Sequence, residues 1–243
     1  MELLLDPNIW IAFAMLTALE IVLGIDNIIF ISILVSKLPK AQQEMARRIG
    51  LFMAMFMRIG LLLVLSWIVG LVEPMLTVQG HAISGRDAIL ILGGLFLIWK
   101  STTEIHDSIE GAEHAQASNK KVTFASVILQ ILVIDLVFSL DSIITAVGMV
   151  DEVEIMIAAV IVSVALMMLF ARAIGEFVSN HPSIKMLALS FLVLVGVVLI
   201  AEGFEHHIPK GYIYFAMAFS VCVEMLNIKF RKLRSSSQSK VPD

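Results

Sequence analysis

Seven apolar runs, most of them long enough to cross a lipid bilayer, constrain this chain more than any other feature. A spanning helix needs about 20 mostly apolar residues, and runs of that length have few other uses in proteins. Within each run there are at most two charged residues. The runs lie at about 8–36, 49–72, 88–99 (extended to 83–103 to span), 122–150, 155–178, 184–201 and 212–228.

Composition supports the same class. Apolar residues make up 59% of the 243 residues and charged residues 16%, and the mean hydropathy is +0.94. A soluble domain of this size could not cover so much apolar surface, which excludes an ordinary soluble enzyme, a coiled coil and a disordered chain. The net charge of -4 and the scattered basic clusters give no case for nucleic-acid binding. The predicted fold is an all-α membrane protein with seven transmembrane helices in a lipid bilayer.

Lysine and arginine are distributed unevenly between the two ends of the predicted spans. Fourteen of the seventeen follow the first, third, fifth and seventh runs, whereas only Arg86 and Lys210 follow the others, and Arg58 lies inside a run. Basic loops stay in the cytoplasm. We therefore expect a multi-pass protein of a bacterial-type inner (plasma) membrane, with the N-terminus outside and the C-terminus in the cytoplasm. The start of the chain lacks the basic region of a cleaved signal peptide, so the first span is expected to be retained.

A short charged motif occurs twice, each time inside an apolar run. Leu19–Phe30 aligns with Ile134–Thr145 at a constant offset of 115 residues. Three spans separate the copies, and an odd number of spans inverts the second unit relative to the first. Inverted repeats with sites near the bilayer midplane are typical of transporters. The aligned polar or small pairs are Glu20 with Asp135, Gly24 with Ser139, Asp26 with Asp141, and Asn27 with Ser142.

The repeat predicts the domain organisation. Repeat one covers about 8–105 and repeat two about 122–203, with a seventh helix at 212–228 outside the repeat and a basic cytoplasmic tail at 229–243. A weaker match at offset 114 pairs Arg58 with Arg172. The whole of 1–228 is then one membrane domain.

The spacing of the acids predicts a local break in both helices. Residues six apart on a straight α-helix are turned by about 240° from each other. Glu20 and Asp26 would then point to different sides. Unwinding at Gly24, and at Ser139 in the second copy, would let both acids of each copy face one cavity. It would also free backbone carbonyl oxygens as ligands.

The repeated residues form an all-oxygen set of candidate metal ligands. Oxygen ligands suit magnesium, calcium and manganese. The alternative is structural pairing of the acids with Arg58, a candidate charge partner that would either neutralise the site or only lock the fold. A charge at the bilayer centre costs about 2.5–3.5 kcal/mol, which is a large penalty for packing alone. The predicted ligands are Glu20, Asp26, Asn27, Asp135, Asp141 and Ser142.

Proton exchange follows from crowding these acids. Four ionised carboxylates would repel one another without a cation, so some should be protonated when the site is empty. Binding of a divalent cation would release protons, and its departure would take them back.

Histidines suggest two weaker sites. His106, Glu110 and His114 have helical i, i+4, i+8 spacing, which fits either a metal feeder site or a solvated helix face. His206 and His207 lie in a predicted outer loop.

The sequence resembles the TerC family of integral membrane proteins. The resemblance rests on EIVLGIDN at Glu20–Asn27, GGLFLIWK at Gly93–Lys100 and FSLDSIITAVG at Phe138–Gly148, followed by KMLALSFL at Lys185–Leu192 and PKGYIYFAMAFS at Pro209–Ser220. It covers essentially the whole chain and is similar to the short family members. The family belongs with LysE-type transporters and is associated with manganese export and with supplying metal to exported enzymes. The resemblance implies that the acids of the two motifs are metal ligands.

The sequence therefore predicts a non-enzymatic exporter of divalent cations, manganese before calcium or magnesium, with protons as the exchanged ion and no resident cofactor. A non-transporting accessory protein of secretion or metal-stress machinery is the alternative, with unknown protein partners. An intramembrane aspartyl protease also uses two buried aspartates, but no Gly-x-Gly-Asp element occurs in the chain.

Overall fold

The computed structural model describes residues 7–64, 74–78, 81–110, 122–147 and 152–238. Within these residues the chain forms seven α-helices and one small β-hairpin, so the predicted all-α membrane class is confirmed. The elements are α1 (Pro7–Val35), α2 (Lys40–Leu63), β1 (Pro74–Val78), β2 (His81–Ser84), α4 (Gly85–Glu110), α5 (Phe124–Val147), α6 (Val153–Asn180), α7 (Pro182–Gly203) and α8 (Lys210–Gln238).

Five helices are long and apolar enough to cross a membrane by length and composition: α1, α4, α6, α7 and α8. Helix α5 contributes a shorter apolar stretch, Phe124–Leu140, and α2 carries several charges in its first half. The described part of the chain therefore has the helical content of a multi-span membrane protein.

Helix α2 begins earlier than predicted. The sequence suggested a span at 49–72, but the helix starts at Lys40 and is described to Leu63. Glu44 forms ion pairs with Arg47 at 2.7 Å and Arg48 at 2.9 Å, one helical turn away. These i,i+3 and i,i+4 pairs stabilise a polar first turn that a hydropathy window does not detect.

Two other boundaries also differ from the prediction. Helix α4 continues to Glu110, and α8 continues as a helix to Gln238 through the segment predicted as a tail. The hairpin of β1 and β2 was not predicted. Ser84 ends β2 and starts α4: its backbone N–H and its hydroxyl both donate to Asp87, whose own backbone N–H donates to the Ser84 hydroxyl. This reciprocal pair is a capping box that fixes where α4 begins.

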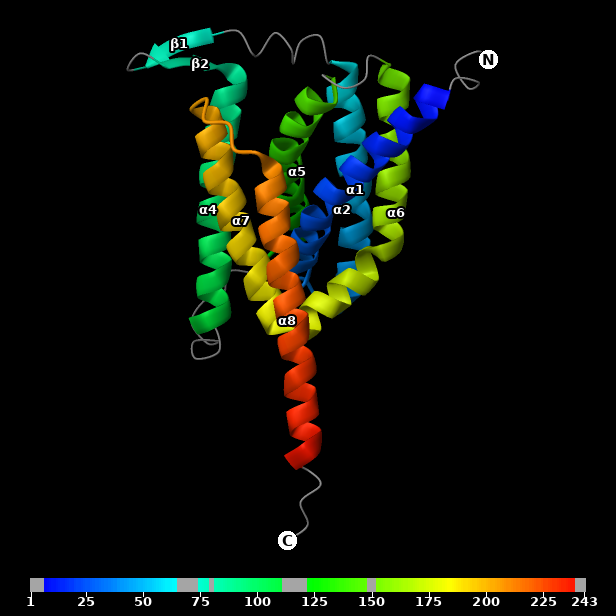
Figure 1. Ribbon diagram of the computed structural model, residues 1–243, viewed down its shortest axis with the longest axis vertical. Helices are drawn as coiled ribbons and strands as arrows, with labels where there is room; N and C mark the ends of the chain where they lie inside the picture. The colour runs from blue at the N-terminus through cyan, green and yellow to red at the C-terminus, as the bar shows by residue number, and fades with distance from the viewer. Residues whose placement is uncertain (1–6, 65–73, 79–80, 111–121, 148–151, 239–243) are drawn as a thin grey trace.

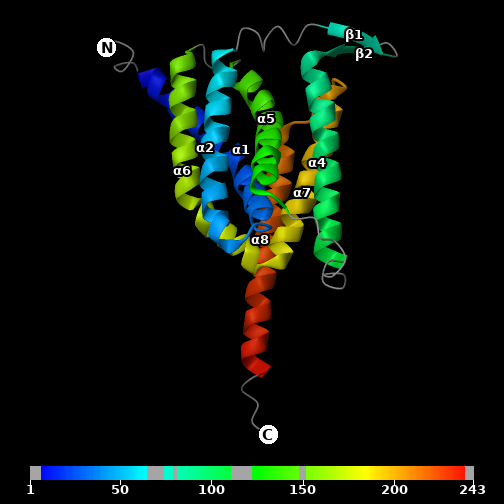
Figure 2. The same cartoon turned by 180° about the vertical axis from the view of Figure 1, so that it is seen from behind.

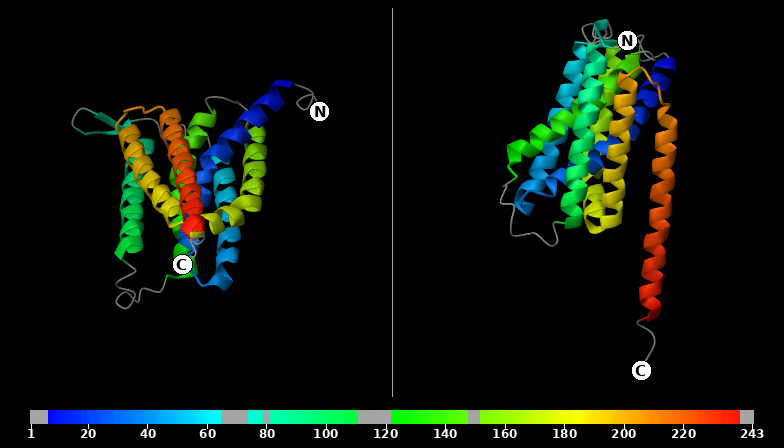
Figure 3. Two further views of the ribbon diagram at one scale, coloured as in Figure 1. Left: turned by 60° about the horizontal axis from the view of Figure 1, so that its bottom comes forward. Right: turned by 90° about the vertical axis from the view of Figure 1, so that its left-hand side faces the viewer.

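The helices form a bundle in which the most extensive contacts join α4 to α7, α1 to α6 and α2 to α5. Figure 1 shows α1 slanting across the bundle, and Figure 2 shows α2 and α5 on the opposite side. Helix α8 contacts mainly α7 and projects beyond the other helices (Figure 3). If α1, α2 and α4 are matched in order with α5, α6 and α7, the α4–α7 pair maps onto itself and the α1–α6 pair maps onto the α2–α5 pair.

Two glycines bring the backbones of α4 and α7 close together where these helices cross. A Cβ added at Gly94 would lie 2.5 Å from the carbonyl oxygen of Gly196, and one at Gly196 would lie 2.8 Å from that of Gly94. Ile200 and Ile98, each one turn further along, complete the contact in the same reciprocal way. Small residues at a crossing let two backbones pack closely in the membrane.

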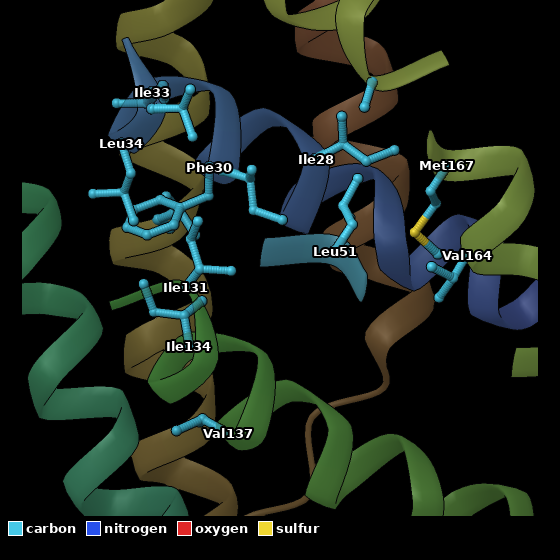
Figure 4. Close-up of a cluster of buried hydrophobic side chains, with 14 of the residues drawn as sticks. Ile28, Phe30, Ile33, Leu34, Leu51, Ile131, Ile134, Val137, Val164 and Met167 are labelled. Carbon is cyan, nitrogen blue, oxygen red and sulfur yellow. The ribbon is translucent and has the colours of Figure 1, made fainter. Parts of the chain in front are cut away.

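The ends of α1, α4 and α6 lie toward one end of the bundle, α8 extends past that end, and the hairpin lies at the other end (Figure 1). The predicted cytoplasmic segments thus share one end. The apolar core between α1, α2, α5 and α6 includes Phe30, Leu34, Ile131 and Ile134 (Figure 4). This core positions the polar cluster described next.

Candidate cation site

A buried ionic cluster joins three helices at the middle of the bundle. Arg58 of α2 donates from Nη1 to Glu20 of α1 at 2.5 Å. It donates from Nε to both carboxylate oxygens of Asp135 of α5, at 3.2 and 3.1 Å, and from Nη2 to Oδ1 of Asp135. The exposed fractions are 6% for Glu20, 4% for Arg58 and 4% for Asp135.

The helices position these groups because each acid lies in an otherwise apolar stretch. Glu20 lies near the middle of α1, and Asp135 lies near the middle of α5. Both helices turn their buried apolar side chains, such as Leu16 and Ile131, inward along with the acid. The charged groups therefore face one another rather than lipid.

Two more side chains complete the cluster. Asn27 of α1 donates from Nδ2 to Asp135 at 3.1 Å, and the hydroxyl of Ser139 donates to Asp135 at 3.2 Å. The amide assignment is chemically required, because an ionised carboxylate only accepts hydrogen bonds. Asn27 is a predicted ligand, so the structure brings three of the predicted residues together: Glu20, Asn27 and Asp135.

Two side-chain oxygens in the described part of α1 have no hydrogen-bond partner, and one of them belongs to Asn27, which contacts Asp135. They are Oδ1 of Asn27 and Oγ1 of Thr17, both buried. An unsatisfied buried polar atom costs about 1–3 kcal/mol, so each one calls for a physical explanation. An oxygen left without a donor beside two carboxylates is suited to a cation.

A small cavity adjoins the cluster. Glu20, Arg58 and Ser142 lie on its wall together with apolar residues of α1, α2, α5 and α6, and it has room for about one water molecule. Ser142, a predicted ligand, donates its hydroxyl to the backbone oxygen of Ser139 at 3.1 Å. It therefore borders the site but does not contact either acid through that bond.

The charge of the cluster is unbalanced. When both acids are ionised, Glu20 and Asp135 bring two negative charges and Arg58 one positive charge. Burying charges is costly, and a residual negative charge among oxygen atoms attracts a cation. The arrangement can therefore bind a positive ion by electrostatics and oxygen ligation, the chemistry that magnesium, calcium and manganese share.

The side chains of Asp26 and Asp141 lie outside the described residues, so their predicted convergence with Glu20 and Asp135 stays a prediction. Across the part of the chain that the structure does describe, no group of three or more His, Cys, Asp or Glu side chains is placed to hold a metal ion. The cluster thus supplies two carboxylates of the predicted four.

The predicted helix breaks are wrong. Helix α1 runs without interruption through Gly24, and α5 runs without interruption through Ser139. The small residues have other uses: Gly24 packs directly against the side chain of Met167 of α6, and Ser139 bonds to Asp135 one turn earlier. The breaks were predicted so that both acids of one motif could face one cavity, whereas here Arg58 joins one acid of each motif, Glu20 and Asp135, across two continuous helices.

The other predicted sites are less well placed. The side chain of His106 is exposed, while Glu110 and His114 lie outside the side chains that the structure describes. His206 and His207 are exposed, and His206 Nδ1 contacts the backbone oxygen of Phe204 at 2.8 Å. Neither histidine region joins the ionic cluster.

A second buried cluster was not predicted. Glu104 of α4 is fully buried and pairs with Lys37 at the end of α1 and with Lys100, each at 2.7 Å, and Lys37 also reaches Asp107 at 3.2 Å. Lys100 and Glu104 have i,i+4 spacing, which was the available sequence signal. The two lysines balance the charges of Glu104 and Asp107. Because Lys37 follows α1 and both acids belong to α4, the ion pairs connect these two helices at the predicted cytoplasmic end.

Comparisons with known proteins agree with this architecture. The sequence matches the profile of the Integral membrane protein TerC family over residues 5–239. It is 57% identical over 223 residues to the UPF0053 inner membrane protein YgdQ of Escherichia coli (strain K12), covering 92% of this chain and 94% of that protein. It is 56% identical to a UPF0053 protein of Haemophilus influenzae over 96% of this chain and 98% of the relative.

A longer relative contains a similar segment. The UPF0053 inner membrane protein YoaE of Escherichia coli (strain K12) is 47% identical over the whole of this chain, which spans 47% of the length of YoaE. No solved structure matches the chain.

Proposed function

The chain belongs to the TerC family of integral membrane proteins, and from this premise we propose that it is a transporter that exports divalent cations, manganese before calcium or magnesium. The cation would bind at Glu20 and Asp135, with Asn27 as a neutral oxygen ligand. Asp26, Asp141 and Ser142 would complete the coordination from the second half of each motif. The bilayer is its environment, and the relatives named as inner membrane proteins support an inner-membrane location.

The single observation that carries this proposal is the buried, negatively unbalanced cluster with an unpartnered oxygen beside it. Ion pairs retained only for packing are replaceable by apolar residues at little cost. Intramembrane ionisable residues that face the bundle interior instead mark ion pathways. Asn27 donates to Asp135 through Nδ2, while its Oδ1 is buried and accepts no hydrogen bond. This oxygen is a free neutral acceptor beside the carboxylate.

A larger cavity supports a route away from the site. It measures about 500 Å³ and lies between the start of α1 and the start of α6. It is lined by Phe13 and Ala158, each within one helical turn of a residue on the smaller cavity, and by Glu152 and Glu154. Acidic side chains at such a mouth attract cations. With the N-terminus outside, this mouth faces the exterior and serves as the exit.

The proposed mechanism is alternating access between two related halves. Helices α1, α2 and α4 would move against α5, α6 and α7, as in transporters with inverted repeats. The cation would be exchanged for protons, which the remaining ligand acids, Asp26 and Asp141, would take up when it leaves. The N-terminus would lie outside the cell and the C-terminus inside.

The test is transport in proteoliposomes. Purified protein is reconstituted with a manganese-sensitive dye inside the vesicles, with and without a pH gradient, and a panel of divalent cations is compared. We expect manganese flux that the pH gradient accelerates and that Asp135→Asn abolishes. Glu176→Gln is the matched control, because Glu176 is an exposed acid on α6 that pairs with Arg172. Wild-type protein that binds manganese but shows no flux would favour the accessory role instead.

A further inference from the structure

Arg58 occupies the place between the two carboxylates where a bound cation would lie. All three of its guanidinium nitrogens are used: Nη1 contacts Glu20, while Nε and Nη2 contact Asp135. The side chain reaches this place from α2, whereas the acids come from α1 and α5. One cation of the protein itself therefore links both copies of the repeated motif.

Both oxygens of Asp135 are already occupied. Oδ1 accepts from Asn27 and from Arg58, and Oδ2 accepts from Ser139 and from Arg58. Divalent cations bind carboxylate oxygens at about 2.0–2.6 Å, through the same lone pairs that these donors use. A cation cannot ligate Asp135 while the guanidinium stays in place.

We propose that Arg58 is a tethered competitor of the transported cation, holding Glu20 and Asp135 when the cargo is absent and leaving both when it binds. The inference rests on the proposed function and names the residue that sets its ion selectivity. It gives the empty transporter a way to cross between its two states without two bare buried carboxylates, which would be costly.

Charge arithmetic gives the selectivity. With Arg58 in place, the three side chains carry one net negative charge. A monovalent ion that replaces the guanidinium brings the two carboxylates no more positive charge than the guanidinium did, whereas a divalent ion brings twice as much and neutralises both. In a buried site the difference is large, since electrostatic energies grow as the dielectric falls. Arg58 therefore excludes sodium and potassium and admits divalent cations.

The tight surroundings couple this exchange to helix movement. The cavity beside Arg58 has room for about one water molecule, which is too little for a displaced guanidinium. The side chain can leave only if α2 moves relative to α1 and α5. Cation binding thereby selects a different arrangement of the helices, as alternating access requires.

The test is equilibrium binding of Mn²⁺ in detergent, followed by the electron paramagnetic resonance signal of free Mn²⁺. For Arg58→Gln we expect binding tightened by about tenfold or more, and we expect 100 mM NaCl to weaken it measurably, unlike in the wild type. Arg58→Lys should tighten binding less, because one ammonium cannot bridge both carboxylates as the guanidinium fork does. Arg172→Gln, on the equivalent helix and exposed, should leave binding unchanged.

Soluble guanidinium provides a second measurement. In Arg58→Ala the space of the side chain is open, so millimolar guanidinium should compete with Mn²⁺, whereas tetramethylammonium should not. In the wild type neither salt should change binding. Weaker or unchanged Mn²⁺ binding in both Arg58→Gln and Arg58→Lys, without guanidinium competition in Arg58→Ala, would overturn the proposal while leaving the proposed function intact. Absence of Mn²⁺ binding in the wild type would instead remove the proposed function and this inference with it.

Discussion

The first three helices, α1, α2 and α4, and the next three, α5, α6 and α7, pack alike but differ in the charge on their second helix. At the α4–α7 crossing the two halves are interchangeable, because Gly94 and Gly196 approach each other reciprocally. On α2, Arg58 is buried between the acids, whereas the side chain of Arg172 on α6 is 71% exposed and pairs with Glu176 one turn along its own helix. Packing is thus shared between the halves, and the counter-cation is supplied by one half only.

This comparison shows how a duplicated motif can give one site. Each copy brings one acid, Glu20 or Asp135, and a single arginine serves both. A second buried arginine at the place of Arg172 would cancel the negative charge that the site needs. The two halves therefore share their packing, but the charge of the site depends on the one position where they differ.

The largest expected effect separates the two arginines. Arg58→Met should destabilise the protein by about 3–5 kcal/mol, because removing one partner of a buried ion pair leaves uncompensated charge. Arg172→Met should unfold indistinguishably from the wild type, since exposed pairs contribute little. Unfolding in mixed detergent micelles measures both. Equal losses for the two variants would show that Arg58 has no special place in the fold.

The next effect concerns what the halves share. Gly94→Val and Gly196→Val should each destabilise by about 3 kcal/mol, because the added side chain meets a backbone oxygen that cannot rotate away. The two losses should agree closely if the crossing is symmetric. Gly60→Ala is the control: no atom lies within 4 Å of its added Cβ, and it should be neutral or stabilising by up to about 1 kcal/mol. A loss at only one of the two crossing glycines would contradict the reciprocal contact.

The smallest effect compares the neutral residues of the two motifs. Asn27→Ala should cost about 2 kcal/mol, because it removes a buried hydrogen bond to a charged carboxylate. Ser142→Ala should cost less than about 1 kcal/mol, since its hydroxyl bonds only to a backbone oxygen of its own helix. Thermal unfolding followed by circular dichroism distinguishes them. A costlier Ser142→Ala would mean that the second motif carries the stronger contact.

Much of the fold follows from apolar periodicity and length. Four of the seven predicted spans, those of α1, α5, α6 and α7, overlap their helices closely, because long apolar stretches have one stable form in a bilayer. Helices α4 and α8 run past the ends of their predicted spans. The start of α2 was missed because the helical segment from Lys40 to Arg48 is too polar to count as an apolar run. The ion pairs of Glu44 with Arg47 and Arg48 stabilise it as a helix. The hairpin before α4 was missed because short strands in a loop leave little periodicity.

The site was predictable in part. The repeated motif identified Glu20, Asn27 and Asp135, and it pointed to Arg58 without deciding whether that residue neutralises acids or locks the fold. It could not show that one guanidinium reaches both acids, because that depends on three helices far apart in sequence. The breaks predicted at Gly24 and Ser139 failed because they assumed that both acids of one motif face the same cavity. In the described residues one acid of each motif, Glu20 or Asp135, meets Arg58 while both helices stay continuous.

The central claim is that the cluster of Glu20, Arg58 and Asp135 is where the cation binds. The most direct measurement is equilibrium Mn²⁺ binding to purified protein, comparing the wild type with Glu20→Gln, Asp135→Asn and the exposed control Glu176→Gln. We predict saturable binding by the wild type and by Glu176→Gln. In each of the two cluster variants we predict that binding weakens by at least about tenfold, because the loss of about 1.4 kcal/mol of binding free energy already gives that factor. Binding that is unchanged in both cluster variants would contradict the account and place the cation elsewhere.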